Sequence, residues 1–244
     1  MSGLAIIDAL MKLLAFDTST ETLHLGASNG QLSLTCALAG GPQSSAQLIP
    51  QATAMLNQLG LSLNQLDAIV MGRGPGSFTG LRTACAVAQG LAYGSGVKVL
   101  TIDTLWAVAE EARQEQAHAH VLAVLDARMG QVYSAAWTYR QGRWHQAANN
   151  ALFDPEQLQW PADWLASPQV LTLAGIGLHD LLPQLKIPQG TIRAEATPTA
   201  GALMRLAPQA WADGLAVSPE LAMPLYVRDK VAQTTAERIA RADP

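Results

Sequence analysis

The stretch GRGPGSFTGLR, residues 72–82, lies between a short apolar run at 68–71 and a helix-forming segment that ends near Tyr93. Glycine permits positive φ angles and lets the backbone approach another surface closely. The apolar run predicts a strand, and Ser77 or Thr79 is suited to cap the helix that follows. The stretch therefore predicts a strand–turn–helix unit, which is typical of α/β proteins.

Two interpretations of this turn are open. Backbone N–H groups at the start of a helix favour an anion, so the turn is a candidate phosphate site. Its spacing matches neither common phosphate fingerprint, because Leu81 follows Gly80 where a lysine is needed, and Thr79 stands where a third glycine should be. The alternative is a tight strand-to-helix turn built for packing.

The residues around the turn alternate between strand and helix patterns. Asn29 and Gly30 both tolerate positive φ, so they predict a tight hairpin between two strands. Asp103 is suited to cap the helix that follows the last strand of this region. The expected elements are strands at 13–17, 22–28, 31–38 and 97–102, and helices at 46–59 and 103–116.

A second strand-and-hairpin pattern begins near residue 121. Its apolar run ends in Asp126, as the run 13–17 ends in Asp17, and the two aspartates are 109 residues apart. This internal repeat predicts two similarly folded lobes with a cleft between them. The remaining expected elements are strands at 121–126, 131–139 and 170–174, a turn at Gln141–Gly142, and helices at 155–160, 179–185 and 199–214.

The expected domain layout has four parts: an extension at 1–10, a first lobe at 11–105, a second lobe at 106–230 and a tail at 231–244. A return of the last helix and the tail to the first lobe is the alternative for the end of the chain. Residues 1–10 are apolar but lack the basic start and the cleavage site of a signal peptide. Because Met11 offers a second start, we expect this extension to lie outside the fold.

The composition limits the classes of function. Of the 244 residues, 49% are hydrophobic and 14% are charged, which indicates a globular chain with a large core. The net charge of −4 provides no general basic field, so any RNA contact is expected to be local or made by a partner. Cys36 and Cys85 are too few for a disulfide framework or a structural zinc site, which suits a reducing cytosol.

Five ordered stretches together resemble one known family. They are FDTSTE at 16–21, GRGPGSFTGLR at 72–82, AQGLA at 88–92, DARMGQVY at 126–133 and PLYVRD at 224–229. The chain is similar to the TsaB family, also called YeaZ, of bacterial tRNA threonylcarbamoyladenosine biosynthesis proteins. The resemblance spans about residues 11–229, and its central motif is long and specific.

The resemblance implies an actin-like ATPase (ASKHA) fold, an α/β architecture of two ribonuclease-H-like lobes with mixed sheets flanked by helices. It also implies a role in forming N6-threonylcarbamoyladenosine next to the anticodon of tRNAs that read codons beginning with A. In that pathway a TsaD-type paralogue transfers the threonylcarbamoyl group from an adenylate to tRNA. The TsaB-type protein is the non-catalytic subunit that pairs with the paralogue and activates it.

The implied partners are the TsaD-type paralogue, a TsaE-type ATPase, and a second copy of this chain when the paralogue is absent. We expect tRNA to be reached only indirectly through the complex, no contact with a membrane, and a cytoplasmic location. The alternatives are an independent ATPase or kinase of the same fold, or residual peptidase activity. Neither an H-E-x-x-H nor a G-x-S-x-G centre is present to support the last of these.

The catalytic paralogue carries an H-x-x-x-H metal motif on the helix after its corresponding strand. Histidines at that spacing point to one face of a helix, as a shared metal requires. Aligned on the preceding strand, the two positions fall at Thr104 and Val108 in this chain. Valine cannot bind a metal, so we expect neither a metal site nor a catalytic residue.

A residual nucleotide or anion site is the alternative for this region. Carboxylates at two strand ends are suited to hold hydrated Mg²⁺, although Arg128 is a candidate to pair with one of them and fill the gap. We expect no required cofactor, with weak binding of ATP or ADP and Mg²⁺ as the alternative. The candidate residues are Asp17, Thr18, Ser19, Gly74, Gly76, Ser77 and Asp126.

Small residues repeat every four positions along the helix after the turn, a spacing that lets another helix approach closely. The resemblance implies pairing through the helices of the first lobe. The expected partner surface therefore consists of Gly80, Ala84, Ala88 and Ala92, with Leu48, Met55 and Leu56 on the neighbouring helix. The alternative is ordinary packing of this stripe against the protein's own sheet.

Overall fold

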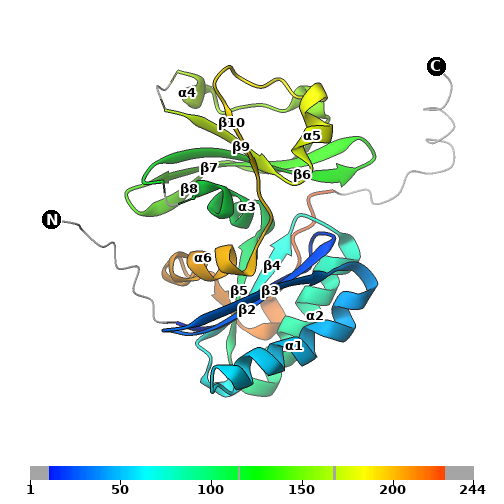
Figure 1. Cartoon of the computed structure of the whole chain (residues 1–244), viewed down its shortest axis with the longest axis vertical. Helices are drawn as coiled ribbons and strands as arrows, with labels where there is room; N and C mark the ends of the chain where they lie inside the picture. The colour runs from blue at the N-terminus through cyan, green and yellow to red at the C-terminus, as the bar shows by residue number, and fades with distance from the viewer. Residues whose placement is uncertain (1–10, 115, 167–168, 229–244) are drawn as a thin grey trace, which may run out of the picture.

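The computed structural model describes residues 11–114, 116–166 and 169–228, which form two lobes stacked along the long axis of the molecule (Figure 1). The expected extension at 1–10 and the expected tail at 231–244 lie outside the described residues. Within the described part of the chain, no helix has the length and the apolar character needed to cross a membrane.

The first lobe is built on a six-stranded mixed sheet. Its strands are β1 (Lys12–Asp17), β2 (Thr22–Asn29), β3 (Ser33–Ala39), β4 (Ala68–Gly74), β5 (Lys98–Asp103) and β11 (Ala216–Val217). The order is β11-β5-β4-β1-β2-β3. β1, β2 and β3 are antiparallel neighbours, whereas β1, β4 and β5 run parallel. β11 pairs with β5, so the chain returns to this lobe near its end.

The second lobe is built on a five-stranded sheet of the same kind. Its strands are β6 (Ala119–Arg128), β7 (Gln131–Arg140), β8 (Arg143–Phe153), β9 (Leu171–Gly175) and β10 (Ile192–Glu195). The order is β10-β9-β6-β7-β8, with β6, β7 and β8 antiparallel and β6, β9 and β10 parallel.

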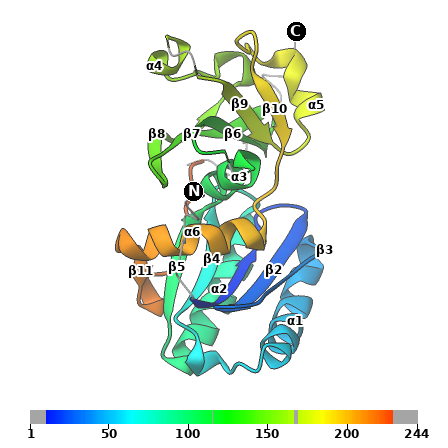
Figure 2. The same ribbon diagram turned by 60° about the vertical axis from the view of Figure 1, so that its left-hand side comes forward.

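Helices cover both sheets. The α-helices are α1 (Ser44–Gln58), α2 (Phe78–Ser95), α3 (Thr104–Arg113), α4 (Ala162–Leu165), α5 (Leu178–Leu181) and α6 (Ala200–Ala212). Among the described residues, single-turn 3₁₀ helices lie at Gly41–Gln43, Leu63–Gln65, Pro155–Gln157, Leu182–Gln184 and Pro219–Leu221. α1 and α2 cover the outer face of the first sheet, whereas α3 and α6 lie between the two sheets (Figures 1 and 2).

The two sheets share one topology. Leaving β11 aside, each sheet places its own five strands in the order third, second, first, fourth, fifth, with the same directions. This is the ribonuclease-H-like arrangement repeated twice, as in the actin-like fold. It confirms the internal repeat, since β1 ends in Asp17 and its counterpart β6 carries Asp126 near its end.

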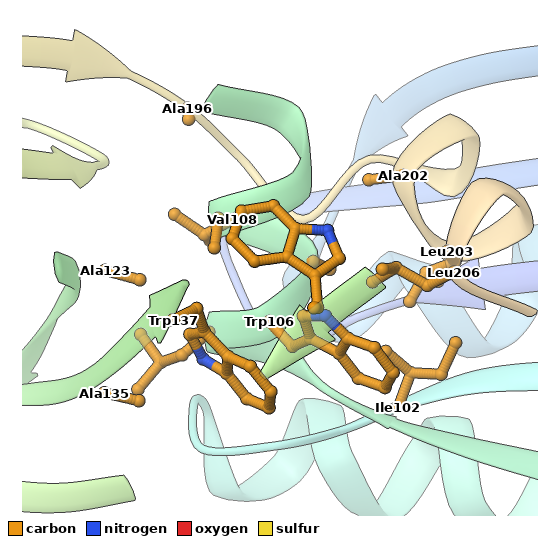
Figure 3. Packing of buried hydrophobic residues seen from close by; sticks show 14 of the residues in the cluster. Ile102, Trp106, Val108, Ala123, Ala135, Trp137, Ala196, Ala202, Leu203 and Leu206 are labelled. Atoms are coloured by element: carbon orange, nitrogen blue, oxygen red, sulfur yellow. The ribbon is translucent and has the colours of Figure 1, made fainter. Parts of the chain in front are cut away.

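The junction between the lobes has an apolar core. Trp106 of α3 and Trp137 of β7 stack with ring centroids 5.1 Å apart and an interplanar angle of 9°. Figure 3 shows the two rings side by side, with Leu203 and Leu206 of α6 on the side of Trp106. The apolar cluster continues into β1, β4 and β5 of the first sheet, so both lobes share this core.

A buried carboxylate reinforces the same junction. Glu110 of α3 is 4% exposed and accepts hydrogen bonds from Arg113 Nε (3.1 Å), Arg205 Nε (2.7 Å) and Trp144 Nε1 (2.8 Å). Arg205 belongs to α6 and Trp144 to β8, so one side chain ties three elements together. Burial alone raises the pKa of Glu110, but these hydrogen bonds outweigh burial and hold the pKa below its usual value.

Local details differ from the expectations at three places. The loop of the β2–β3 hairpin is longer than the predicted two residues, because the last strand pair is Ser28 with Ser33. Within this loop the Asn29 side-chain oxygen accepts the N–H of Leu32 at 2.8 Å. Of the predicted pair, only Gly30 has positive φ. The Asp103 side chain does not cap α3, since its carboxylate accepts hydrogen bonds from other side chains instead.

The third difference lies in the second lobe. The helix predicted at 155–160 is a single 3₁₀ turn at Pro155–Gln157, whereas the helix predicted at 179–185 is present as α5 followed directly by the 3₁₀ turn Leu182–Gln184. β8 and β10 have no predicted counterpart. β8 is an edge strand that is mostly exposed, so its residues lack the apolar alternation that marks a half-buried strand.

Replacing Glu110 tests the polar tie at the lobe junction. Glu110→Gln removes the carboxylate that Arg113 and Arg205 share, and we expect the free energy of unfolding at pH 7 to fall by about 3 kcal/mol. Because the pKa of Glu110 is lowered in the folded protein, its ionised form stabilises the fold above its usual pKa and stops doing so as the pH falls. Urea denaturation at several pH values measures both effects.

The matched control is Glu111→Gln, since Glu111 is 34% exposed and shares Arg205. We expect that change to lower the free energy of unfolding by less than about 1 kcal/mol. Equal losses for the two variants would show that the buried position of Glu110 has no special weight.

Candidate functional site

The glycine-rich turn connects β4 to α2 and packs on the loop after β1. Ser77 rather than Thr79 caps α2, since the Ser77 Oγ accepts the N–H of Gly80 at 3.4 Å. Gly74 has a φ of +114°, a conformation that other residues rarely adopt. The turn therefore has the strand-to-helix geometry that the sequence predicts.

Two glycines of the turn are required by how closely the loop after β1 approaches them. A Cβ on Gly72 would lie 1.7 Å from Asp17 Oδ2, and a Cβ on Gly80 would lie 1.8 Å from the carbonyl oxygen of Thr18. Both distances are far inside van der Waals contact, so any larger residue would force the two loops apart.

The polar groups of the turn are engaged by the same loop. The N–H of Ser77 donates to the carbonyl oxygen of Ser19 at 2.7 Å, and the hydroxyl of Thr18 donates to the carbonyl oxygen of Gly80 at 2.7 Å. A Cβ on Gly76 would lie 2.6 Å from the Ser19 carbonyl oxygen. These contacts support packing as the role of the turn, because a backbone donor that would face an anion is used within the chain.

Asp17 is enclosed at the end of β1. It is 0% exposed, and its Oδ1 accepts hydrogen bonds from Ser19 N at 2.8 Å and Ser19 Oγ at 2.6 Å. Its Oδ2 accepts a longer bond from Thr104 Oγ1 at 3.4 Å. Burial raises the pKa of Asp17 to about 6, although the bonds from Ser19 and Thr104 act in the opposite direction.

The two positions expected to correspond to the paralogue's metal ligands are both buried. Thr104 is 0% exposed and its hydroxyl is turned to Asp17, whereas Val108 is 0% exposed in the core between the lobes. Among the residues that the structure describes, no three His, Cys, Asp or Glu side chains are grouped as metal ligands would be.

Asp126 has a different environment from its counterpart Asp17. Its side chain is 50% exposed, and its Oδ1 accepts the N–H of Arg128 at 2.7 Å. The Arg128 guanidinium lies 3.5 Å from Asp126 and donates to Glu21 of the first lobe at 2.7 Å. Arg128 therefore pairs with Asp126, as one expectation had it, and with Glu21 rather than Asp17. Since this bridge is largely exposed, it stabilises little.

The structure contradicts the expected partner surface. The six apolar side chains assigned to it are buried in the first lobe's own core and pack against Leu14 and Phe16 of β1. Gly80, which is partly exposed, lies against the loop after β1. The small residues face inward because α2 lies close to the sheet, so the alternative of internal packing holds. The buried residues are Leu48, Met55, Leu56, Ala84, Ala88 and Ala92.

The opposite side of the same two helices is exposed and almost uncharged. α1 has no charged residue, and α2 has one, Arg82. Helices that face water normally carry charges on that side. We name this surface the outer α1–α2 face, and it includes Ile49, Phe78, Arg82, Ala86, Gly90 and Tyr93.

The outer α1–α2 face contains a shallow hollow of about 420 Å³ beside the start of α2. Phe78, Arg82, Ala86 and Val87 are among its lining residues. Elsewhere on the two helices, Ile49 of α1 is 46% exposed and Tyr93 of α2 is 63% exposed. An exposed apolar surface of this kind is typical of a protein–protein contact. The near absence of charged residues from both helices is the sequence signal that could have identified it.

A larger groove of about 1200 Å³ lies between α6, the β2–β3 hairpin and the β7–β8 hairpin. Charged side chains along it pair with one another: Arg205 binds Glu110 and Glu111, and Arg143 binds Asp213. These pairs hold the lobes together and leave the groove without a concentrated charge.

Comparison with known proteins gives a consistent result. The family model described as TsaD, tRNA N6-adenosine threonylcarbamoyltransferase, matches residues 41–209. The tRNA threonylcarbamoyladenosine biosynthesis protein TsaB of Escherichia coli is 33% identical over 228 residues, which cover 91% of this chain and 96% of that protein. The Haemophilus influenzae TsaB protein is 35% identical over 60% of this chain and 66% of its own length.

A solved structure supports the same assignment. YeaZ from Pseudomonas aeruginosa superposes with a TM-score of 0.79 at 34% identity, covering 88% of this chain and 99% of that one. The resemblance read from the five sequence motifs is thereby confirmed.

The buried carboxylate makes stability depend on pH. Because the pKa of Asp17 rises from an ordinary 3.8 to about 6 on folding, the folded protein holds this proton more tightly than the unfolded chain does. The protonated form therefore favours folding at low pH, and that stability is lost as the pH rises to about 6.

Asp17→Asn cannot ionise and keeps an acceptor for Ser19. Between pH 4 and pH 7, we expect the free energy of unfolding of the unaltered chain to fall by about 3 kcal/mol relative to Asp17→Asn. Urea denaturation across this range measures the difference, with the exposed Asp126→Asn as the control that changes nothing. Parallel curves for the unaltered chain and Asp17→Asn would show that Asp17 titrates normally.

Proposed function

The chain belongs to the TsaB family, and on that premise we propose that it takes part in forming N6-threonylcarbamoyladenosine in tRNA. In this proposal it is a non-catalytic subunit that pairs with a TsaD-type threonylcarbamoyltransferase and activates it. The observation that carries the pairing is the outer α1–α2 face, whose only charged residue in the two helices is Arg82.

The enclosed end of β1 supports a non-catalytic role. Asp17 is fully buried against Gly72 and Thr104, and Ser77 and Ser19 join the two neighbouring loops. An independent ATPase or kinase needs this region open to phosphate and metal. The chain therefore requires no cofactor of its own in this proposal.

The likeness between this chain and the TsaD-type transferase family supports the geometry of pairing. Because the transferase family's own model matches residues 41–209, the partner is expected to have helices equivalent to α1 and α2. Equivalent helices can pack about an approximate twofold axis, as in a homodimer. The same surface lets two copies of this chain pair when the transferase is absent.

The net charge of the chain bears on how tRNA reaches the proposed assembly. With a net charge of −4, this chain has no general basic field for tRNA, so tRNA binds through the complex in the cytoplasm. A TsaE-type ATPase completes the proposed assembly.

The inner and outer sides of α2 allow a matched test of the pairing face. Ala86 is exposed and Ala88 is 0% exposed on the same helix. Ala86→Arg places a long charged side chain at the hollow, so we expect affinity for the transferase to fall roughly 100-fold, with the melting temperature within about 2 °C of the unaltered chain. Ala88→Arg buries an unpaired charge and should prevent folding.

Isothermal titration calorimetry with the purified transferase measures affinity, and circular dichroism measures folding. Ala212→Arg, at an exposed position on α6, is the control that should bind normally. Unchanged affinity of folded Ala86→Arg would exclude the outer α1–α2 face as the contact.

A further inference from the structure

The last described segment, residues 219–228, runs along α2 and then crosses to the second lobe. It leaves the first sheet after β11 and begins with the 3₁₀ turn Pro219–Leu221. Figure 1 shows this end of the chain, coloured orange to red, rising from the first lobe toward the second. We name residues 219–228 the C-terminal strap.

The lower part of the strap is fixed to α2. Ala222 is 0% exposed, and its carbonyl oxygen accepts hydrogen bonds from Cys85 Sγ at 2.9 Å and Gln89 Nε2 at 3.2 Å. Glu220 accepts a bond from the Tyr93 hydroxyl at 3.4 Å. The strap therefore lies along one edge of the outer α1–α2 face.

The middle of the strap meets the glycine-rich turn and the start of α2. The N–H of Leu225 donates to the carbonyl oxygen of Arg73 at 2.7 Å. The Tyr226 ring packs on Phe78 with centroids 5.4 Å apart, and the Tyr226 hydroxyl accepts a bond from Arg82 Nε at 3.1 Å. Phe78 and Arg82 also line the hollow of the outer α1–α2 face.

The end of the strap holds the β6–β7 turn of the second lobe. Arg228 Nη2 donates to the carbonyl oxygens of Ala127 at 3.0 Å and Arg128 at 3.2 Å, and Nη1 lies 2.9 Å from Met129 Sδ. Arg128 and Met129 have φ angles of +62° and +60°, which residues other than glycine rarely adopt. Arg228 therefore joins the strap directly to the backbone of this turn.

We propose that the C-terminal strap couples the partner face of the first lobe to the β6–β7 turn of the second lobe. This inference rests on the proposed function, since it requires a partner on the outer α1–α2 face. A partner that packs on Phe78 and Arg82 fixes Tyr226 between them and its own surface. Arg228 lies two residues further along the chain, so fixing Tyr226 restrains the guanidinium that holds the turn.

This coupling through the C-terminal strap needs no change in the apolar core between the lobes. Glu110 and the stacked tryptophans join the lobes elsewhere, so the body of the molecule stays fixed. The exposed turn at 126–131 is the part of the second lobe that responds. Partner binding thus restrains a turn that also carries Asp126, the counterpart of Asp17.

Hydrogen–deuterium exchange tests the coupling. For the full chain with the purified transferase, we expect amides in peptides covering residues 126–131 to exchange at least threefold more slowly than in the free chain. Arg228→Ala should abolish this slowing while leaving the affinity for the transferase within threefold of the unaltered value. Arg228→Lys, which keeps the charge but not the fork of donors, should give an intermediate slowing.

Arg193→Ala, which removes an exposed arginine elsewhere on the second lobe, is the matched control and should retain the full effect. Slowing that persists in Arg228→Ala would show that the transferase contacts the turn directly, and it would overturn the proposed coupling through the strap. Normal binding with no slowing in the unaltered chain would overturn the strap alone. No binding by the unaltered chain would overturn the proposed function and the strap with it.

Discussion

The contact between the glycine-rich turn and the loop after β1 determines much of the first lobe. A methyl group at residue 72 or residue 80 would overlap with Asp17 or Thr18, so the two loops can meet only where side chains are missing. Their closeness buries Asp17 and sets the point at which α2 begins. It also sets the distance of α2 from the sheet, which is why alanines line the inner side of that helix.

The two lobes share one topology, but the aspartates at the corresponding strand ends have different surroundings. In the first lobe the carboxylate at the end of β1 is enclosed and partly protonated at mildly acidic pH, so it acts as a packed polar group. In the second lobe the corresponding Asp126 stays in water and caps a turn. The duplication therefore survives in the strand order, while the two corresponding carboxylates differ in their surroundings.

The sequence predicts the sheets of this fold better than its surfaces. Strands β1, β4, β5 and β6 are recognisable as continuous apolar runs, and the repeated aspartate reveals the duplication. The stripe from Gly80 to Ala92 shows the limit of such reasoning, since small residues suit both an inner face against a sheet and an outer face against a partner. Spacing alone cannot tell these apart, and the burial of the stripe in the structure decides for the inner face. The strap could not be predicted, because its contacts join residues more than 90 positions apart.

The near absence of charge from α1 and α2 has a consequence for how the protein behaves in the cell. In the proposed complex, a face with a single charged residue would favour contact with another copy of the chain whenever the transferase is absent. Synthesis in excess over its partner would leave that face uncovered and open to aggregation. On the proposed function, balanced production of the two proteins would keep this face covered.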